Sequence, residues 1–127
     1  MDNAIAYDLV PASGAHGPVD RFEEYDSRAT IDAVASALSA LGHRPRCLGG
    51  GRRFLTEVLA QPPELVFNMA EGFGGSSREA HVPSVCEMLA IPYTHSDPLT
   101  LTTTLDKPTA KRVVDEHGLR TPPFAVV

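Results

Sequence analysis

A segment rich in glycine and serine, residues 71–79, is the strongest candidate for ligand binding in this sequence. It reads Glu-Gly-Phe-Gly-Gly-Ser-Ser-Arg-Glu and follows the apolar run 65–69 after one residue, Ala70. Glycines let the backbone approach a ligand closely, and a helix that follows offers free N–H groups to an anion. The candidate substrate-binding residues are Glu71, Gly72, Gly74, Gly75, Ser76, Ser77, Arg78 and Glu79. The same composition suits a flexible connector whose serines cap a helix, so both interpretations stay open.

Two further charged positions could contact a ligand. Pro108 disfavours helical geometry in the residue before it, so Lys107 is expected at a break between helices, where its ammonium could reach a phosphate. A solvated lysine is the plainer interpretation. Glu23 and Glu24 precede the first expected helix and could pair with a ligand ammonium, although acids there more often complement the helix dipole.

Several familiar sites are not expected. No glycine run is followed by Lys-Ser/Thr, no GxGxxG opens a helix after the first strand, and the glycines at 49–51 therefore indicate a turn. Cys47 and Cys86 lack disulfide or zinc spacing and are expected to be buried free thiols. The five histidines form no HExxH or triad-like pattern. We therefore expect no metal ligands and no catalytic residues within this chain.

Composition limits the class of protein. The 127 residues are 43% apolar and 21% charged, which predicts a single globular domain with an aliphatic core. The net charge of −5 disfavours binding to nucleic acid. The acidic N-terminus does not resemble a signal peptide, and no apolar run approaches the ~20 residues of a membrane span. A cytoplasmic protein without membrane attachment is expected.

The elements that must position these residues alternate between strand and helix patterns. This alternation predicts an α/β fold, a mostly parallel sheet of four to five strands flanked by helices. The expected strands are residues 5–10, 46–48, 65–69 and 91–94, with another beginning at 122–127, and the run 65–69 is typical of a central strand. Residues 11–18 are expected to form a Gly/Pro-rich loop. Because complete domains seldom end in an unclosed apolar strand, the chain is expected to be part of a longer polypeptide.

The expected helices have clear start and stop signals. Asp26 and Ser27 are good N-cap residues for a helix that ends near Gly42, and Pro62 ends a second helix that contains Phe54 and Val58. A third helix carries Val82, Val85, Cys86 and Leu89 on one face. Asp97 before Pro98 begins a fourth, and a fifth runs from the break near Lys107 to His117, with Gly118 as its cap.

Three segments of the second half of the chain carry a resemblance to a known family. They are Ile-Pro-Tyr-Thr-His-Ser at 91–96, Leu-Asp-Lys at 105–107 with Lys111 beyond, and Gly-Leu at 118–119 followed by Thr-Pro-Pro-Phe at 121–124. In order and spacing they are similar to the Leu/Ile-Pro-Tyr-Thr-Gly-Ser, Met-Asp-Lys and Gly-Leu/Val-Pro-x-Pro segments of D-alanine–D-alanine ligases in the ATP-grasp superfamily. Residues 66–127 thus resemble the end of the N-terminal domain of these enzymes.

The resemblance implies a Rossmann-like pre-ATP-grasp domain over residues 1–121, with 122–127 starting the strand into a missing ATP-grasp domain. It implies a ligase that uses ATP and Mg²⁺ to convert a carboxylate into an acyl phosphate, which an amine attacks, in peptidoglycan (cell-wall) biosynthesis. In the family the lysine of Met-Asp-Lys reaches the ATP phosphates, a role that maps onto Lys107. The segment 71–79 maps onto the loop that faces the amino-acid or dipeptide substrate. A homodimer through this domain is also implied.

This chain departs from the family at two places. The family loop has His-Gly and then Gly-Glu-Asp-Gly, whereas this chain has Glu71-Gly72 and then Ser-Ser-Arg-Glu. The family pattern Gly-Gly-x-Ser-x-Glu after the first strand is absent from residues 9–14, which leaves Glu24 as a positional candidate for the glutamate that holds the substrate ammonium. These departures disfavour D-alanine as the substrate and leave a related amino acid or a peptide open.

Two further interpretations stay open beside the enzyme fragment. Because the family places its nucleotide between two lobes and its magnesium-binding carboxylates beyond the equivalent of residue 127, the chain alone is expected to be inactive and to bind neither ATP nor Mg²⁺ tightly. It could instead be a stand-alone, non-catalytic binding or dimerisation module with the same fold. A flavodoxin-like cofactor binder is the third interpretation and would bind a flavin or dinucleotide.

Overall fold

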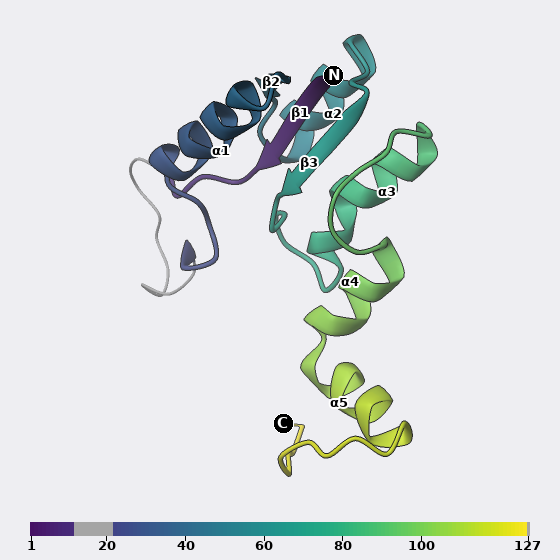
Figure 1. Ribbon diagram of the computed structural model, residues 1–127. Coiled ribbons are helices and arrows are strands. Elements are labelled where there is room, and N and C mark those ends of the chain that lie inside the picture. Colours follow the sequence, from purple (N-terminus) through teal and green to yellow (C-terminus); the bar gives the residue numbers. More distant parts are fainter. Residues whose placement is uncertain (12–21, 127) are drawn as a thin grey trace.

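A parallel three-stranded sheet forms the centre of the computed structural model, which describes residues 1–11 and 22–126 (Figure 1). Strand β1 (Asp2–Tyr7) lies between β2 (Arg44–Cys47) and β3 (Leu65–Met69). In the register, Ala4 of β1 lies beside Arg46 on one side and Val66 on the other. The predicted α/β class with a parallel sheet is confirmed.

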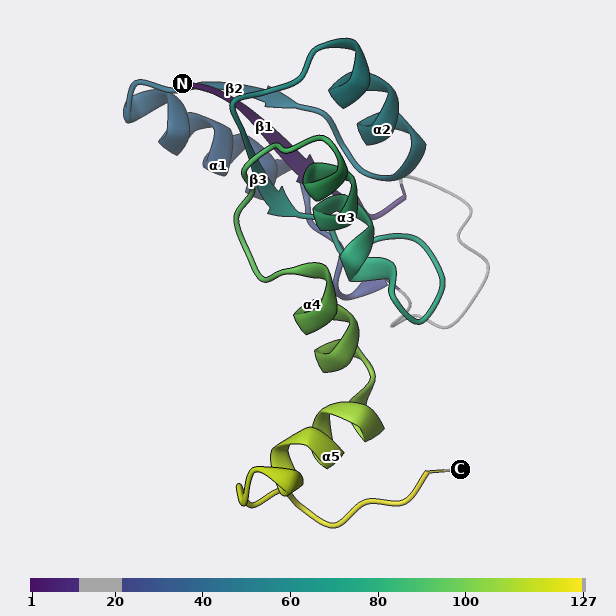
Figure 2. The ribbon, with the colours of Figure 1, turned by 90° about the vertical axis from the view of Figure 1, so that its right-hand side faces the viewer.

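Helices cover both faces of this sheet and make three layers (Figures 1 and 2). Helix α1 (Arg28–Ala40) packs on one face through Ile31, which joins Ile5 and Tyr7 in a buried cluster. Helices α2 (Gly51–Ala60) and α3 (His81–Met88) cover the other face, where Ala4 and Ala6 point. The second cluster comprises Ala4, Ala6, Leu48, Phe54, Val58, Val66, Ala70, Val82, Cys86 and Ile91. Successive residues of β1 therefore point to opposite layers, as the pleat requires.

The helix signals in the sequence are confirmed by the caps. Ser27 Oγ accepts the Thr30 N–H at 3.1 Å, and Gly42 follows α1 with a φ of 83°. Asp97 caps α4 (Pro98–Leu105) by accepting the N–H groups of Leu99 and Thr100 at 2.9 and 3.0 Å. The helix break at residues 105–108 also occurs, because α5 (Lys107–Glu116) starts a new helix capped by Asp106.

The predicted number of strands and several of their bounds are wrong. The first strand is Asp2–Tyr7 rather than 5–10, because pairing on both sides takes in Asp2 and Asn3, and Asp8 turns away from the sheet toward Gly72. The second is Arg44–Cys47 rather than 46–48, and Pro45 is tolerated on a strand with one paired side. The central strand is β1, not the predicted 65–69.

The expected strand at 91–94 is reduced to a single bridge. Val66 donates to the Pro92 carbonyl at 2.9 Å, and Thr94 donates to the Val66 carbonyl at 3.0 Å. The next N–H along β3, that of Asn68, is taken by the Thr94 side chain at 3.0 Å instead of a backbone carbonyl. The ladder stops there, so three strands form rather than four or five.

The predicted strand at the end of the chain is not formed in the part that the structure describes. Residues 122–126 have no strand geometry, and among the described elements no strand lies beside them to pair with. The expected Gly/Pro-rich loop at 11–18 lies outside the described residues except for Pro11.

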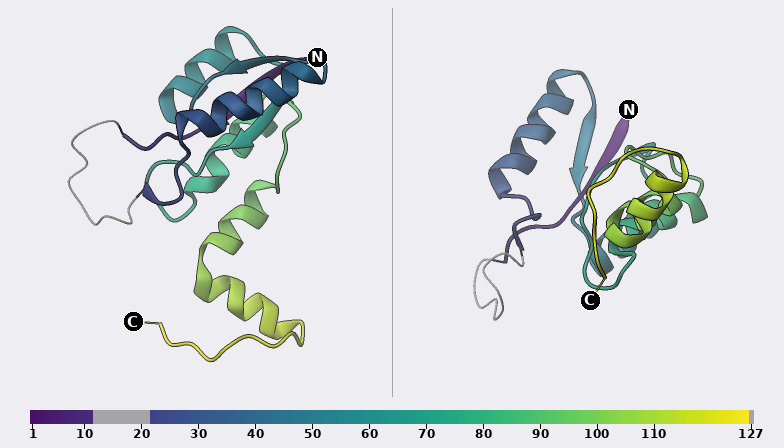
Figure 3. Two further views of the ribbon diagram at one scale, coloured as in Figure 1. Left: turned by 60° about the vertical axis from the view of Figure 1, so that its left-hand side comes forward. Right: turned by 90° about the horizontal axis from the view of Figure 1, so that it is seen from below.

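Helices α4 and α5 extend away from the sheet. Helix α4 contacts α3 and the short 3-10 turn η2 (Arg78–Ala80), and α5 packs on α4 at the far end of the molecule (Figures 1 to 3). Lys111 fixes the last described residues against α5, because its ammonium donates to Thr121 Oγ1 at 3.0 Å and to the Pro122 carbonyl at 3.1 Å. Across residues 1–11 and 22–126, none of the helices combines the length and apolar character needed to cross a membrane.

Candidate functional site

The carboxyl ends of β1 and β3 meet at one edge of the sheet, where parallel sheets bind ligands. Asp8 follows β1, and the segment 70–77 follows β3. Asp8 Oδ2 accepts the Gly72 N–H at 2.7 Å, and Asp8 is only 2% exposed. Burial raises the pKa of Asp8, and the hydrogen bonds from the Gly72 and Glu71 amides oppose that rise. The start of the predicted binding segment is thereby fixed to the central strand.

Gly72 is held from a second side. Tyr25, which precedes α1, donates its hydroxyl to the Gly72 carbonyl at 3.0 Å. Gly72 has a φ of 78°, and a Cβ atom built on it would overlap the carbonyl group of Arg78. Glycine is therefore required at this position by both conformation and space. Gly74 and Gly75 also have positive φ, but a Cβ atom on either would meet open space.

An ion pair closes the other end of the segment. Arg78 donates to Glu24 Oε2 at 2.7 Å and links η2 to the turn before α1. Glu71 and Glu79 also act electrostatically on Arg78, so one cation faces three carboxylates. Burial raises the pKa of Glu71, and the charges of Glu79 and Glu24 raise it further. The segment therefore has an excess of negative charge.

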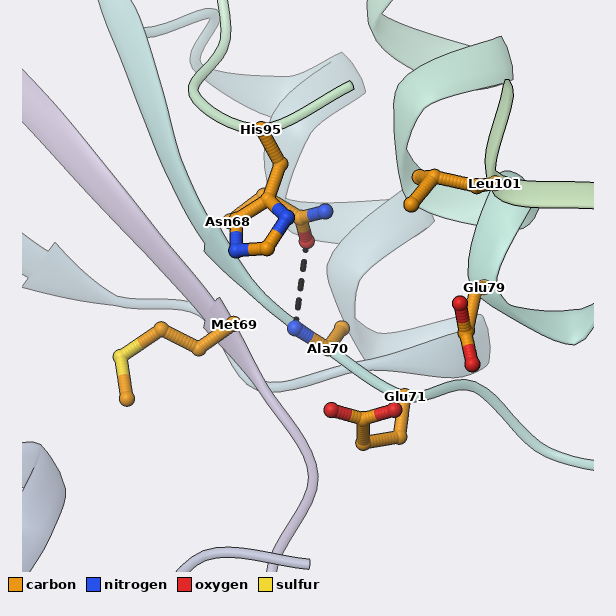
Figure 4. A pocket seen from close by; sticks show the side chains of 7 residues that line it. All are labelled: Asn68, Met69, Ala70, Glu71, Glu79, His95 and Leu101. Atoms are coloured by element: carbon orange, nitrogen blue, oxygen red, sulfur yellow. Dashed lines mark hydrogen bonds between the residues drawn. The ribbon is translucent and has the colours of Figure 1, made fainter. Parts of the chain in front are cut away.

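A small cavity of about 60 Å³ opens beside this acidic group (Figure 4). Its lining residues are Asn68, Met69, Ala70, Glu71, Glu79, His95 and Leu101. The carboxylates of Glu71 and Glu79 lie on one side of it, and Asn68 and His95 lie across from them (Figure 4). Asn68 is 4% exposed, and its Oδ1 accepts the Ala70 N–H at 3.2 Å. A second cavity of about 240 Å³ is lined by Phe22, Glu24, Tyr25, Phe73, Gly74 and Arg78.

Lys107 does not belong to this group in the structure. It is the first residue of α5, is exposed, and has no hydrogen-bond or ion-pair partner among the described residues. The N-terminus of α5 is already capped by Asp106, whose Oδ2 accepts the Thr109 N–H at 3.0 Å and whose pKa is lowered by hydrogen bonds with Thr109. A phosphate would therefore meet the Lys107 ammonium rather than free N–H groups at this helix start.

The residues predicted from sequence are thus partly brought together. Glu24, Glu71, Gly72, Arg78 and Glu79 converge at the edge of the sheet. Gly74, Gly75 and Ser76 form an exposed turn, Ser77 precedes η2, and Glu23 is exposed in the turn before α1. Lys107 stands apart on α5.

Sequence reasoning missed Asp8, Tyr25, Asn68 and His95. Asp8 and Asn68 had a usable signal, because each is a polar residue at or just after the end of an apolar strand. His95 has a φ of 83°, a left-handed conformation that is uncommon for a residue with a side chain. It occupies the place of the glycine in the Pro-Tyr-Thr-Gly-Ser segment of the resembling family.

The remaining chemically interesting residues have structural roles. Cys86 is fully buried in the core between α3 and the sheet, and burial raises the pKa of its thiol to about 11. Cys47 is half-buried in β2, and both cysteines are free. Gly50 caps α2, and a Cβ atom there would overlap the Asp8 carboxylate. Among the described residues, no three His, Cys, Asp or Glu side chains are arranged to hold a metal ion.

Comparisons with known proteins agree on one relationship. No family model matches the chain. The D-alanine–D-alanine ligase of Moorella thermoacetica is 37% identical over 92 residues, 72% of this chain and 29% of the ligase. That of Anaplasma centrale is 31% identical over 94 residues, 74% of this chain and 45% of the ligase. An uncharacterized protein of Sinorhizobium fredii, y4sG, is 36% identical over 104 residues, 76% of this chain and 31% of that protein.

Comparison with solved structures also finds a D-alanine–D-alanine ligase. The structure of D-alanine–D-alanine ligase from Bacillus anthracis superposes with a TM-score of 0.70 and 17% sequence identity, covering 97% of this chain and 37% of that one. The chain spans less than half the length of each of these relatives. In sequence and in fold, the chain therefore resembles the N-terminal, pre-ATP-grasp domain of the D-alanine–D-alanine ligase-like proteins of the ATP-grasp superfamily.

Proposed function

We propose that this chain is the substrate-binding N-terminal domain of an ATP-dependent carboxylate–amine ligase of the D-alanine–D-alanine ligase type. The observation that carries the proposal is the identity of 37% to the Moorella thermoacetica ligase across 72% of the chain. In this proposal, residues 1–121 form the domain, and residues 122–127 lead into ATP-grasp lobes that act as its partner. The chain alone binds substrate but does not complete the reaction.

The segment 71–79 receives the amino-acid or dipeptide substrate. Its position at the carboxyl edge of the sheet, with Gly72 held by Asp8 and Tyr25, supports this role because a fixed backbone positions a ligand without further ordering. The exposed turn at Gly74, Gly75 and Ser76, with half-buried Ser77 after it, offers N–H and hydroxyl groups. Glu24 is less free than expected, since Arg78 already pairs with it at 2.7 Å.

In this proposal, ATP and Mg²⁺ are bound mainly by the partner lobes. In such a ligase a carboxylate is activated with ATP as an acyl phosphate, and an amine then displaces the phosphate. The described residues fit one part of this chemistry. The unpaired, exposed Lys107 ammonium suits a phosphate oxygen, and no three His, Cys, Asp or Glu side chains gather to hold a metal ion in the described ranges. We therefore propose that Lys107 contributes charge to the nucleotide site and that the metal ligands lie outside this domain.

A chimera tests this proposal. The chain would replace the matching segment of the Moorella thermoacetica ligase, and ADP release would be followed with ATP, Mg²⁺ and a panel of amino acids and dipeptides. We expect amino-acid-dependent ADP release from the chimera and none from the 127-residue chain alone. ADP release by the isolated chain, or a folded chimera that is inactive with every substrate while the parent ligase is active, would contradict the proposal.

Lys107 is tested in the same chimera. Lys107→Ala is expected to lower kcat/KM for ATP by at least about tenfold, since it removes a charge-assisted contact to a phosphate. Arg120→Ala is the matched control, because it removes an exposed cation a short distance along the chain. Equal effects of the two changes would count against a role of Lys107 in the nucleotide site.

Three further parts of the proposal have their own measurements. Peptidoglycan synthesis is tested by complementation of a bacterial strain deficient in D-alanine–D-alanine ligase with the chimera. Cytoplasmic location is tested by cell fractionation of the tagged chain. A homodimer is tested by the molar mass of the purified chain in solution. A dimer that binds ligands although every chimera is inactive would favour a stand-alone module.

A further inference from the structure

The cavity beside β3 is more acidic than a site for a free amino acid requires. Glu71 and Glu79 line it, and no lysine or arginine is among its lining residues in the described part of the chain. Arg78, the nearest cation in sequence, pairs with Glu24 at 2.7 Å and lines the second cavity instead. A carboxylate entering this cavity would meet two like charges and no compensating cation.

Asn68 supplies a second, independent indication of a ligand. The residue is 4% exposed, and its Oδ1 is used by the Ala70 N–H. Its amide nitrogen has no partner among the described residues and points into the cavity toward Leu101 (Figure 4). An N–H donor that faces a cavity is available to a ligand that brings an acceptor oxygen.

The size and walls of the cavity restrict the ligand further. About 60 Å³ is much smaller than the several hundred Å³ of a typical small-molecule pocket. It accommodates the end of a molecule, and Leu101 and Ala70 provide apolar surface for a short alkyl group. The two carboxylates and the Asn68 amide then contact the polar atoms at that end.

We propose that this cavity recognises a primary ammonium group next to an uncharged carbonyl, as at the N-terminal residue of a peptide or in an amino-acid amide, in preference to a free zwitterionic amino acid. The ammonium pairs with Glu71 and Glu79, and the carbonyl oxygen accepts from Asn68. This inference rests on the proposed function, because it names the substrate class of the same site. It explains why Glu71 stands where the resembling family has histidine.

Three small compounds of similar size test the inference: one has an ammonium and an amide, one an ammonium and a carboxylate, and one an amide alone. The 127-residue chain, labelled with ¹⁵N, would be titrated with alaninamide, alanine and propanamide, each chiral compound in both D and L forms, with amide shifts of residues 68–79 and 94–95 as readout. We expect saturable shifts with one form of alaninamide at millimolar concentration. Binding of the matching alanine is expected to be at least about tenfold weaker, because its carboxylate faces Glu71 and Glu79.

Variants test whether Glu71 and Glu79 themselves bind the ligand, as opposed to the overall negative charge of the domain. Glu71→Gln and Glu79→Gln are each expected to weaken alaninamide binding about tenfold or more, with the folded spectrum retained. Glu116→Gln, an exposed change on α5, is the matched control and should leave alaninamide binding unaltered. The inference is overturned if alanine binds as tightly as alaninamide, or if neither glutamine variant weakens binding. An active chimera together with either result would leave the proposed function standing, whereas no binding by any compound would overturn the inference and remove support for substrate binding.

Discussion

Asp8 and Gly72, which are 64 residues apart, are joined by a 2.7 Å hydrogen bond from the Gly72 amide to the buried Asp8 carboxylate. This bond connects the end of the central strand to the first turn of the predicted substrate loop. The second oxygen of Asp8 is buried without a partner among the described residues and packs against Gly50. Three segments at the carboxyl edge of the sheet thus meet at one carboxyl group.

Replacing Asp8 with alanine should destabilise the domain by about 1–3 kcal/mol, because the Gly72 N–H would lose its acceptor in a buried place. Urea denaturation followed by circular dichroism measures the change. Asp115→Ala, an exposed substitution on α5 with no side-chain hydrogen bond among the described residues, is the control and should stay within about 0.5 kcal/mol of the wild type. Equal stability of the two variants would contradict the role assigned to Asp8.

The two glycines at 72 and 74 should respond differently to the same substitution. Gly74→Ala adds only the strain of a positive φ in open space and should cost about 1–2 kcal/mol. Gly72→Ala adds a collision with the Arg78 backbone and should cost clearly more. Urea denaturation of both variants in parallel gives the difference. A Gly72→Ala variant no less stable than Gly74→Ala would show that the loop avoids the collision by moving.

Most of the fold could be predicted because its signals are local. The N-cap at Ser27, the Asp97-Pro98 helix start and the break at Pro108 each act within a few residues, and the structure has all three. The number of strands depends on pairing between distant segments. Whether Tyr93 extends the sheet depends on Thr94 Oγ1 taking the Asn68 N–H, which no pattern in residues 91–94 indicates.

The candidate site was predictable to the same extent. The glycine and serine composition of 71–79 indicated the segment, and its place after the apolar run 65–69 indicated the edge of the sheet at which it lies. The Glu24–Arg78 ion pair joins residues 54 positions apart, and Tyr25 reaches Gly72 across 47 positions. Such contacts are set by packing of α1 and β3, so spacing along the chain cannot reveal them.

Substitution of the N-cap of α1 tests whether a helix-start signal read from a few neighbouring residues contributes to stability. Ser27→Ala removes the acceptor of the Thr30 N–H and should cost about 1 kcal/mol. Ser36→Ala, on the same helix, removes only a hydroxyl that donates to the Asp32 carbonyl at 2.7 Å and should be neutral or slightly stabilising. Thermal unfolding of the two variants compares them directly. A Ser36→Ala change as harmful as Ser27→Ala would mean that the cap is not what stabilises the helix.

The two thiols should differ in reactivity. Cys86 is fully buried with a pKa raised to about 11, so little thiolate is present at pH 8 and the reagent has no access. Half-buried Cys47 should react first with a thiol reagent under native conditions, and Cys86 only after denaturation. Mass spectrometry of the modified chain and of the Cys47→Ser variant identifies the site. Rapid labelling of Cys86 in the native Cys47→Ser variant would contradict the packing of α3.

The acidic loop should make the stability of the domain depend on pH in a definite direction. Burial, with the charges of Glu79 and Glu24, raises the pKa of Glu71 above its ordinary value of 4.5, while Arg78 opposes the rise. The folded state therefore holds the proton more tightly than the unfolded state, and stability is lost as pH rises from about 4.5 through the raised pKa. Glu71→Gln removes this titration, so the stability of the wild type relative to the variant should fall between pH 4.5 and 7.5. Urea denaturation across that range measures it, with Glu116→Gln as the exposed control. A wild type that gains stability relative to Glu71→Gln as pH rises would mean that Arg78 outweighs burial and the neighbouring glutamates at this site.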